Sequence, residues 1–86
     1  MTFSLHKNFI KDFSRVNRKQ QMAFLERRDL FLQKPFHPML ANHKLTGKYE
    51  GYRSFNVTGD IRVIFRQTSP EAVLFARIGT HNQLYE

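Results

Sequence analysis

The sequence has 86 residues, of which 41% are hydrophobic and 14% aromatic, and we predict one domain over residues 1–86. Lys and Arg number 14 against 7 Asp and Glu, and the net charge of +7 favours a polyanionic partner. The absence of cysteine excludes disulfides, thiolate nucleophiles and Cys-based zinc sites. No apolar run approaches the roughly 20 residues that cross a bilayer, and residues 1–20 are too charged for a signal peptide. We therefore expect a soluble, cytoplasmic protein that does not bind membranes.

The first half of the chain has helical periodicity. In residues 6–16 apolar side chains recur at i, i+4 and i+7 while Lys and Arg take the opposite side, which predicts an amphipathic helix with a basic face. Asn17 followed by Gln20 is typical of a capping box that opens a second helix. Pro35 ends that helix shortly before it. Ahead of both helices, residues 2–5 alternate polar and apolar side chains and predict a short strand.

The second half changes to the period of two that β-strands show. Residues 34–51 form a connection marked by proline and glycine, long enough to suggest a functional loop. After it we predict an antiparallel meander of three strands joined by short turns, at residues 52–57, 61–67 and 72–78. The sequence therefore predicts an α+β fold in the order β-α-α-β-β-β, with two N-terminal helices packed on a small, mainly antiparallel sheet.

Histidine, arginine and aspartate on a basic surface are the groups left to carry chemistry. The four histidines lack HExxH or HxH spacing, so we expect neither a metal nor a cofactor. A glycine-rich phosphate loop and a GxSxG serine elbow are also missing from the sequence. RNA cleavage suits this set, because histidine transfers protons near neutral pH and arginine stabilises charge growing on a phosphate.

Four motifs in the second half occur in a characteristic order: NHKLTG at 42–47, GYR at 51–53, GDIRVIF at 59–65 and IGTHNQLY at 78–85. In this order they resemble the RelE/ParE toxin superfamily, and they are most similar to its YafQ-like messenger RNA interferases. The resemblance implies a RelE-like fold and the toxin of a type II toxin–antitoxin system. It also implies an endoribonuclease that inhibits translation by cleaving messenger RNA on the ribosome, leaving 2′,3′-cyclic phosphate and 5′-hydroxyl ends.

The resemblance also implies roles for individual residues. The catalytic histidine of the Gly-Thr-His motif falls on His81, and a second catalytic histidine, acting as base or phosphate ligand, falls on His43. The aspartate of the middle turn falls on Asp60, and the arginine that contacts the scissile phosphate in the RelE branch falls on Arg62. The aromatic residue that holds the substrate falls on Tyr85.

Ordinary structural roles remain open for several of these residues. Asp60 stands where any hairpin turn favours aspartate. Arg62 and Arg66 share one face of a strand and can simply point outward. Tyr85 can pack on the core instead of stacking on an RNA base. Asn56 departs from the YafQ-like pattern, which can have a histidine there, so a site that uses that histidine would be incomplete.

A cluster of cationic residues accompanies the motifs, separate from the basic face of the helices. We expect it to bind substrate phosphates, and its members are Lys44, Lys48, Arg53, Arg66 and Arg77. The resemblance also implies a cognate antitoxin in a hetero-oligomer, with messenger RNA and ribosomal RNA as further partners. We expect an acidic or amphipathic antitoxin helix to lie across the sheet or the first helix, and residues 80–86 to be a segment that it displaces. The alternatives are a ParE-like gyrase-inhibiting toxin and a non-catalytic binding module with a RelE fold.

Overall fold

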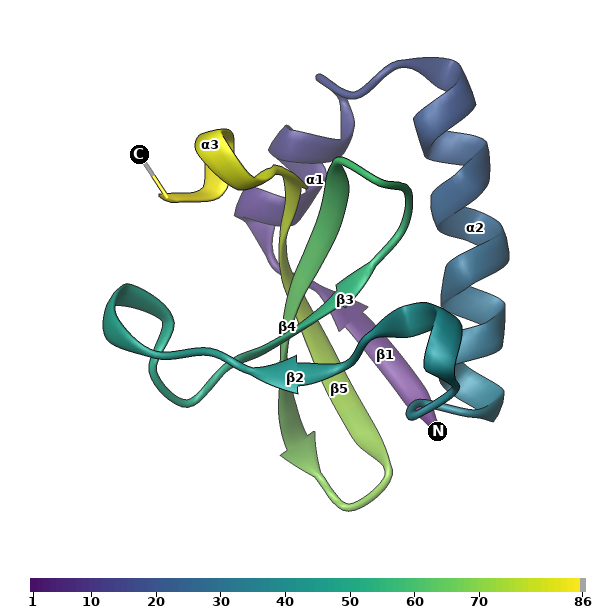
Figure 1. The fold of residues 1–86 in the computed structure, drawn as a ribbon. Coiled ribbons are helices and arrows are strands. Elements are labelled where there is room, and N and C mark those ends of the chain that lie inside the picture. Colours follow the sequence, from purple (N-terminus) through teal and green to yellow (C-terminus); the bar gives the residue numbers. More distant parts are fainter. Residues whose placement is uncertain (86) are drawn as a thin grey trace.

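Five strands form one sheet in the computed structural model, which describes residues 1–85 (Figure 1). The sheet has the order β1-β5-β4-β3-β2, and only β1 runs parallel to its neighbour. The strands are β1 (Thr2–Leu5), β2 (His43–Lys44), β3 (Arg53–Asn56), β4 (Ile61–Ser69) and β5 (Ala72–Thr80). The predicted first strand and three-stranded meander are therefore confirmed, and β2 adds an outer strand that the sequence pattern did not indicate.

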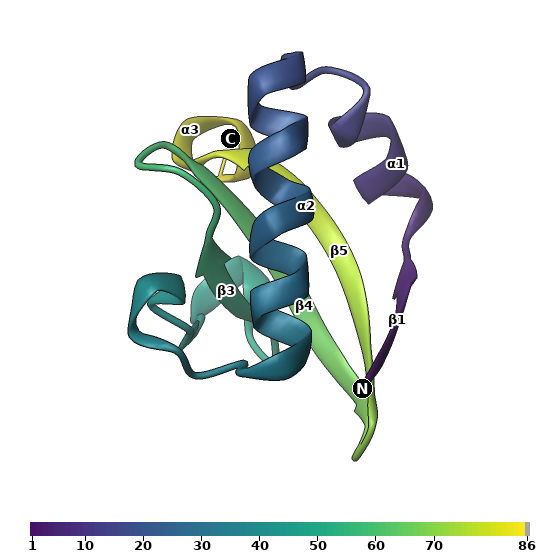
Figure 2. The ribbon, with the colours of Figure 1, turned by 90° about the vertical axis from the view of Figure 1, so that its right-hand side faces the viewer.

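The helices α1 (Lys7–Phe13) and α2 (Arg18–Gln33) follow β1. Helix α2 begins after Asn17 with the predicted capping box. The Asn17 side chain accepts from the Gln20 backbone N–H at 2.8 Å, and the Gln20 side chain accepts from the Asn17 backbone N–H at 3.1 Å. Helix α1 is shorter than predicted because the chain turns after Phe13 to enter this cap. In Figure 2, α2 crosses in front of the sheet, with α1 beside it.

The main core lies between these helices and the sheet. Phe31 of α2 is 1% exposed and its ring stacks on Phe55 of β3 with centroids 4.7 Å apart. Phe9 of α1 and Phe24 of α2 both contact the ring of Phe75 in β5. Phenylalanines thus make up half of the buried residues in this core.

A smaller cluster lies away from this core and carries the C-terminal end of the described chain. Tyr49, Ile64 and Leu84 are buried together there. Tyr49 ends the short 3₁₀ helix η2 (Gly47–Tyr49), and a second one, η1 (Pro38–Leu40), precedes β2. Leu84 belongs to α3 (His81–Tyr85), a helix too short for its periodicity to be recognised in the sequence. None of the helices within residues 1–85 is long and apolar enough to span a membrane.

Candidate active site

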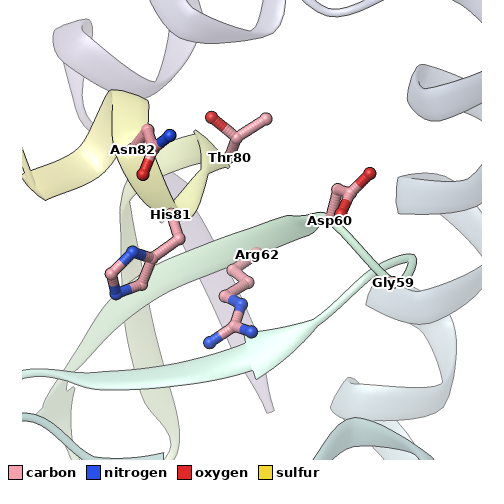
Figure 3. Close-up of a pocket in the computed structure, with 6 residues that line it drawn as sticks. All are labelled: Gly59, Asp60, Arg62, Thr80, His81 and Asn82. Carbon is pink, nitrogen blue, oxygen red and sulfur yellow. The ribbon is translucent and has the colours of Figure 1, made fainter.

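A pocket of about 380 Å³ opens where β4 begins and β5 ends (Figure 3). Its lining comes from the β3–β4 turn, the start of β4, the end of β5 and the start of α3: Gly59, Asp60, Arg62, Thr80, His81 and Asn82. The antiparallel register explains this meeting, because Arg62 pairs with Gly79 and Ile61 pairs with Thr80. The sheet therefore brings the Gly-Asp-x-Arg and Gly-Thr-His motifs to one place.

His81 is the first residue of α3 and is exposed to solvent. A local cap fixes the start of the helix. The Gln83 backbone N–H donates to Thr80 Oγ1 at 3.2 Å, and the Thr80 backbone N–H donates to Gln83 Oε1 at 2.9 Å. Glycine at position 79 leaves room for the Gln83 side chain to fold back onto the Thr80 backbone, because a Cβ atom at position 79 would lie 3.0 Å from Gln83 Oε1. The His81 ring stacks on Tyr85 with centroids 4.6 Å apart, so its orientation depends on α3.

Arg62 provides the cation of the pocket. Its Nε atom is buried and has no hydrogen-bond partner within residues 1–85. An unsatisfied buried donor is costly and calls for an explanation, which a bound anion would supply. In Figure 3 the guanidinium and the His81 imidazole extend to the same side of β4, whereas the Asp60 carboxylate points away from both.

Asn56 lies beside Arg62 on the neighbouring strand. The two residues are paired across β3 and β4, so their side chains lie on the same face of the sheet. A histidine at position 56 would thus stand next to the phosphate-binding candidate. Asn56 supplies an amide there, which can hydrogen-bond but cannot transfer a proton in the way an imidazole does.

His43 lies on the outermost strand, β2, and is not among the described residues that line the pocket. Its Nδ1 atom is 2.8 Å from the carbonyl oxygen of Ala41. Because a carbonyl can only accept, Nδ1 carries the proton and Nε2 of a neutral ring is left as a proton acceptor. Ala41 has a positive φ of 49°, which is uncommon for a residue with a side chain. Among the described residues, the structure does not bring His43 and His81 into one pocket.

The other cations predicted to bind substrate lie on β2, β3 and β4 and in η2. Lys44 and Arg53 share a second depression, and Arg53 donates to Asn42 Oδ1 at 2.7 Å. The Arg66 guanidinium lies over the Tyr52 ring, 5.8 Å from its centroid. The Lys48 ammonium is 3.5 Å from the carbonyl oxygen of Leu84 in α3.

Arg77, also predicted to bind substrate, forms an ion pair with Asp12 of α1. Its Nε and Nη2 atoms donate to the two carboxylate oxygens of Asp12, at 2.6 and 3.1 Å. The hydrogen bond to Asp12, together with its charge, raises the pKa of Arg77 above the ordinary value for arginine, although burial opposes this. Asp12 is only 8% exposed and also accepts from the Ile78 amide. The signal of this ion pair that is visible in the sequence is a single acidic residue in an otherwise basic first helix.

Metal-binding geometry is not found in residues 1–85, where no three His, Cys, Asp or Glu side chains come close enough to hold an ion.

A family model described as the bacterial toxin of type II toxin–antitoxin systems, YafQ, matches residues 1–86. The chain belongs to this family. Its fold agrees with that of YafQ from E. coli strain BL21(DE3), with a TM-score of 0.79 and 23% identity over 98% of this chain and 97% of that one. The YoeB/ParE toxin from Agrobacterium tumefaciens has a TM-score of 0.76 and 18% identity, over 94% of this chain and 99% of that one. No sequence among the curated proteins matches this chain.

The YafQ family is also known bound to a partner. The E. coli DinJ–YafQ toxin–antitoxin complex contains a chain with a TM-score of 0.74 and 24% identity, covering 98% of this chain and 96% of that one. Membership of the YafQ family and these folds confirm the RelE-like α+β architecture that the motifs implied, and identify a type II toxin. Identities this low establish a shared fold and do not carry residue roles from one protein to the other.

Proposed function

We propose that this YafQ-family toxin is an endoribonuclease that cleaves messenger RNA on the ribosome without a metal ion and so inhibits translation. The observation that carries the proposal is the pairing of Arg62 and His81 in one pocket, where Arg62 Nε is buried without a partner in the described chain. A phosphodiester supplies what this pair lacks. Its anionic oxygens would accept from the guanidinium, and its leaving group would take a proton from the imidazole.

In the proposed reaction the RNA 2′-hydroxyl loses its proton to a base, and the 2′-oxygen attacks the adjacent phosphorus. The bond from phosphorus to the 5′-oxygen breaks, and His81 in its protonated form gives a proton to that oxygen. The products are a 2′,3′-cyclic phosphate and a 5′-hydroxyl. Arg62 holds the charge that grows on the non-bridging oxygens, which is the largest single contribution in many such sites.

The remaining candidates have supporting roles in the proposal. His43 suits the base or a phosphate ligand, because its hydrogen bond to Ala41 leaves Nε2 unprotonated in the neutral ring. His43 would reach the RNA only if the bound RNA extends from the pocket across the sheet toward β2. Tyr85 is 38% exposed beside His81, which leaves part of its ring available for stacking on a base. Asp60 either shapes the turn or assists the pocket.

Three functions can be separated in one experiment with the purified protein. We expect cleavage of a message on programmed ribosomes, with 2′,3′-cyclic phosphate ends at the cut sites, and much weaker cleavage of the same RNA alone. Inhibition of DNA supercoiling by gyrase, without RNA cleavage, would instead indicate a ParE-like toxin. RNA binding with neither activity would indicate a non-catalytic module, the outcome that Asn56 makes worth testing.

We also propose where the cognate antitoxin binds. An apolar groove of about 280 Å³ lies between β1, α1 and α2, and its rim includes Ile10 at 57% exposure and Leu25 at 36%. Exposed apolar surface of this kind marks protein interaction sites, and a groove between helices suits the apolar face of an amphipathic helix. The groove adjoins the first helix, one of the two places expected for an amphipathic antitoxin helix. The displacement of residues 80–86 by the antitoxin stays a separate prediction, because none of the groove residues belongs to that segment. Glu86 of this segment lies outside the described residues.

Charge placed in this groove should weaken antitoxin binding. We expect Ile10→Glu to raise the dissociation constant of the toxin–antitoxin complex about 30-fold or more, since losing a buried interface anchor costs on the order of 2 kcal/mol. Calorimetric titration with the cognate antitoxin measures this change. Met22→Glu is the matched control, because Met22 is 54% exposed on α2 but does not line the groove. Equal effects of the two variants would rule out the groove.

A further inference from the structure

A chain of hydrogen bonds joins the first helix to the last. Asp12 of α1 accepts from Arg77 of β5, and Arg77 Nη1 donates in turn to the Tyr49 hydroxyl at 3.3 Å. The Tyr49 hydroxyl donates to the backbone carbonyl of Leu84 in α3 at 2.7 Å. We call these four residues the α3 clamp. The clamp connects elements that are far apart in the sequence and ends within the helix that carries His81.

The chemistry of the groups fixes the direction of every bond in the clamp. The Leu84 carbonyl can only accept, so the single hydroxyl proton of Tyr49 points toward it. The Tyr49 oxygen then accepts from Arg77, whose guanidinium has only donors. Hydrogen bonds arranged in this way polarise one another, and the charged pair at the far end strengthens the bond to α3.

Helix α3 needs an external support of this kind. It has five residues, and helices so short are not stable in water without tertiary contacts. Its start is capped by Thr80 and Gln83, and its far end is held by the buried Leu84 side chain and the bond from Tyr49. The Tyr49 ring also packs edge-on against Tyr85, on which His81 stacks.

We infer that Tyr49 is a positioning residue for His81, because its hydroxyl fixes α3 so that the imidazole stays in the pocket beside Arg62. The inference rests on the proposed function, in which His81 transfers a proton. Tyr49 does not line the pocket around His81, so it acts only through α3. Tyr49 belongs to η2, far from α3 in the sequence, and its side chain is buried together with Leu84 of α3.

The test is Tyr49→Phe, which keeps the ring and removes the hydroxyl. We expect the turnover number for RNA on ribosomes to fall roughly fivefold, the factor that one hydrogen bond of ordinary strength supplies, with KM changed less than about twofold. Nuclear magnetic resonance should show lower backbone order parameters for residues 81–85 than in the wild type, approaching the flexible range of about 0.6. The His81 ring protons should also lose part of the shift that the Tyr85 ring induces.

Tyr52→Phe is the matched control. Tyr52 packs against Tyr49 with centroids 6.2 Å apart, but its hydroxyl makes no hydrogen bond within residues 1–85. It should leave turnover, order parameters and His81 shifts unchanged. Unchanged order in α3 of Tyr49→Phe, or a loosened α3 with full turnover, would overturn the inference. If the wild type cleaves no RNA, the proposed function fails, while the order parameters and His81 shifts still decide whether Tyr49 holds His81 in place.

Discussion

His81→Ala should lower RNA cleavage by about 100- to 10,000-fold, the range that a positioned general acid contributes. In the proposed reaction the 5′-oxygen leaves as an alkoxide unless it is protonated, and His81 is the imidazole that lines the pocket together with Arg62. The imidazole is exposed and stacks on the partly exposed Tyr85 ring, so little of the fold depends on it. Rates of cleavage on programmed ribosomes measure the loss, and growth inhibition on expression should disappear with it.

The control for this variant is His37→Ala. His37 caps η1 and accepts from the Met39 amide, so the variant removes an imidazole away from the pocket. Its cleavage rate should stay within about threefold of the wild type, because surface substitutions of this kind have small effects. Cleavage by His81→Ala at a rate near that of the wild type would remove His81 from the mechanism, and the acid would have to be sought among the other groups of the pocket.

The fold was largely predictable because its signals are local. The capping box at Asn17, the change of period after residue 51 and the turn at residues 59–60 each depend on neighbouring residues, and the structure places elements at all three. Strand β2 and helix α3 were not predicted for the opposite reason. Each is too short to show a period, and each is defined by partners elsewhere, β2 by pairing with β3 and α3 by the α3 clamp.

The candidate site was also predictable only in part. The motifs predicted that His81 and Arg62 belong to one site, and the register of β4 with β5 explains why the two residues lie close together. Arg77 shows what composition cannot resolve. Composition counts Arg77 as one more cation of the basic segment, whereas the structure pairs it with Asp12, 65 residues away. A long-range ion pair of this kind leaves only a weak signal in the sequence, here one acidic residue in a basic helix, and that signal does not name the partner.

Arg62→Met should abolish most of the cleavage while leaving the protein at least as stable as the wild type. Removing one preorganised donor to a developing oxyanion costs about 100- to 1,000-fold in rate. In the free protein, however, Arg62 Nε is buried without a partner in the described chain. Replacing an unsatisfied polar group by an apolar side chain of similar shape should raise the free energy of unfolding by about 1 kcal/mol. Single-turnover cleavage and urea unfolding measure the two effects.

The opposite signs of these effects separate a catalytic role from a structural one. If Arg62 were needed for folding, its replacement would lower activity and stability together. Arg62→Lys should recover part of the activity, since it keeps the charge but lacks the planar fork that binds two phosphate oxygens. Arg66→Met is the matched control on the same strand, where the guanidinium lies over Tyr52. It should weaken RNA binding slightly at low salt and leave the turnover number unchanged. If Arg62→Met cleaved normally, or lost stability along with activity, Arg62 would be a structural residue.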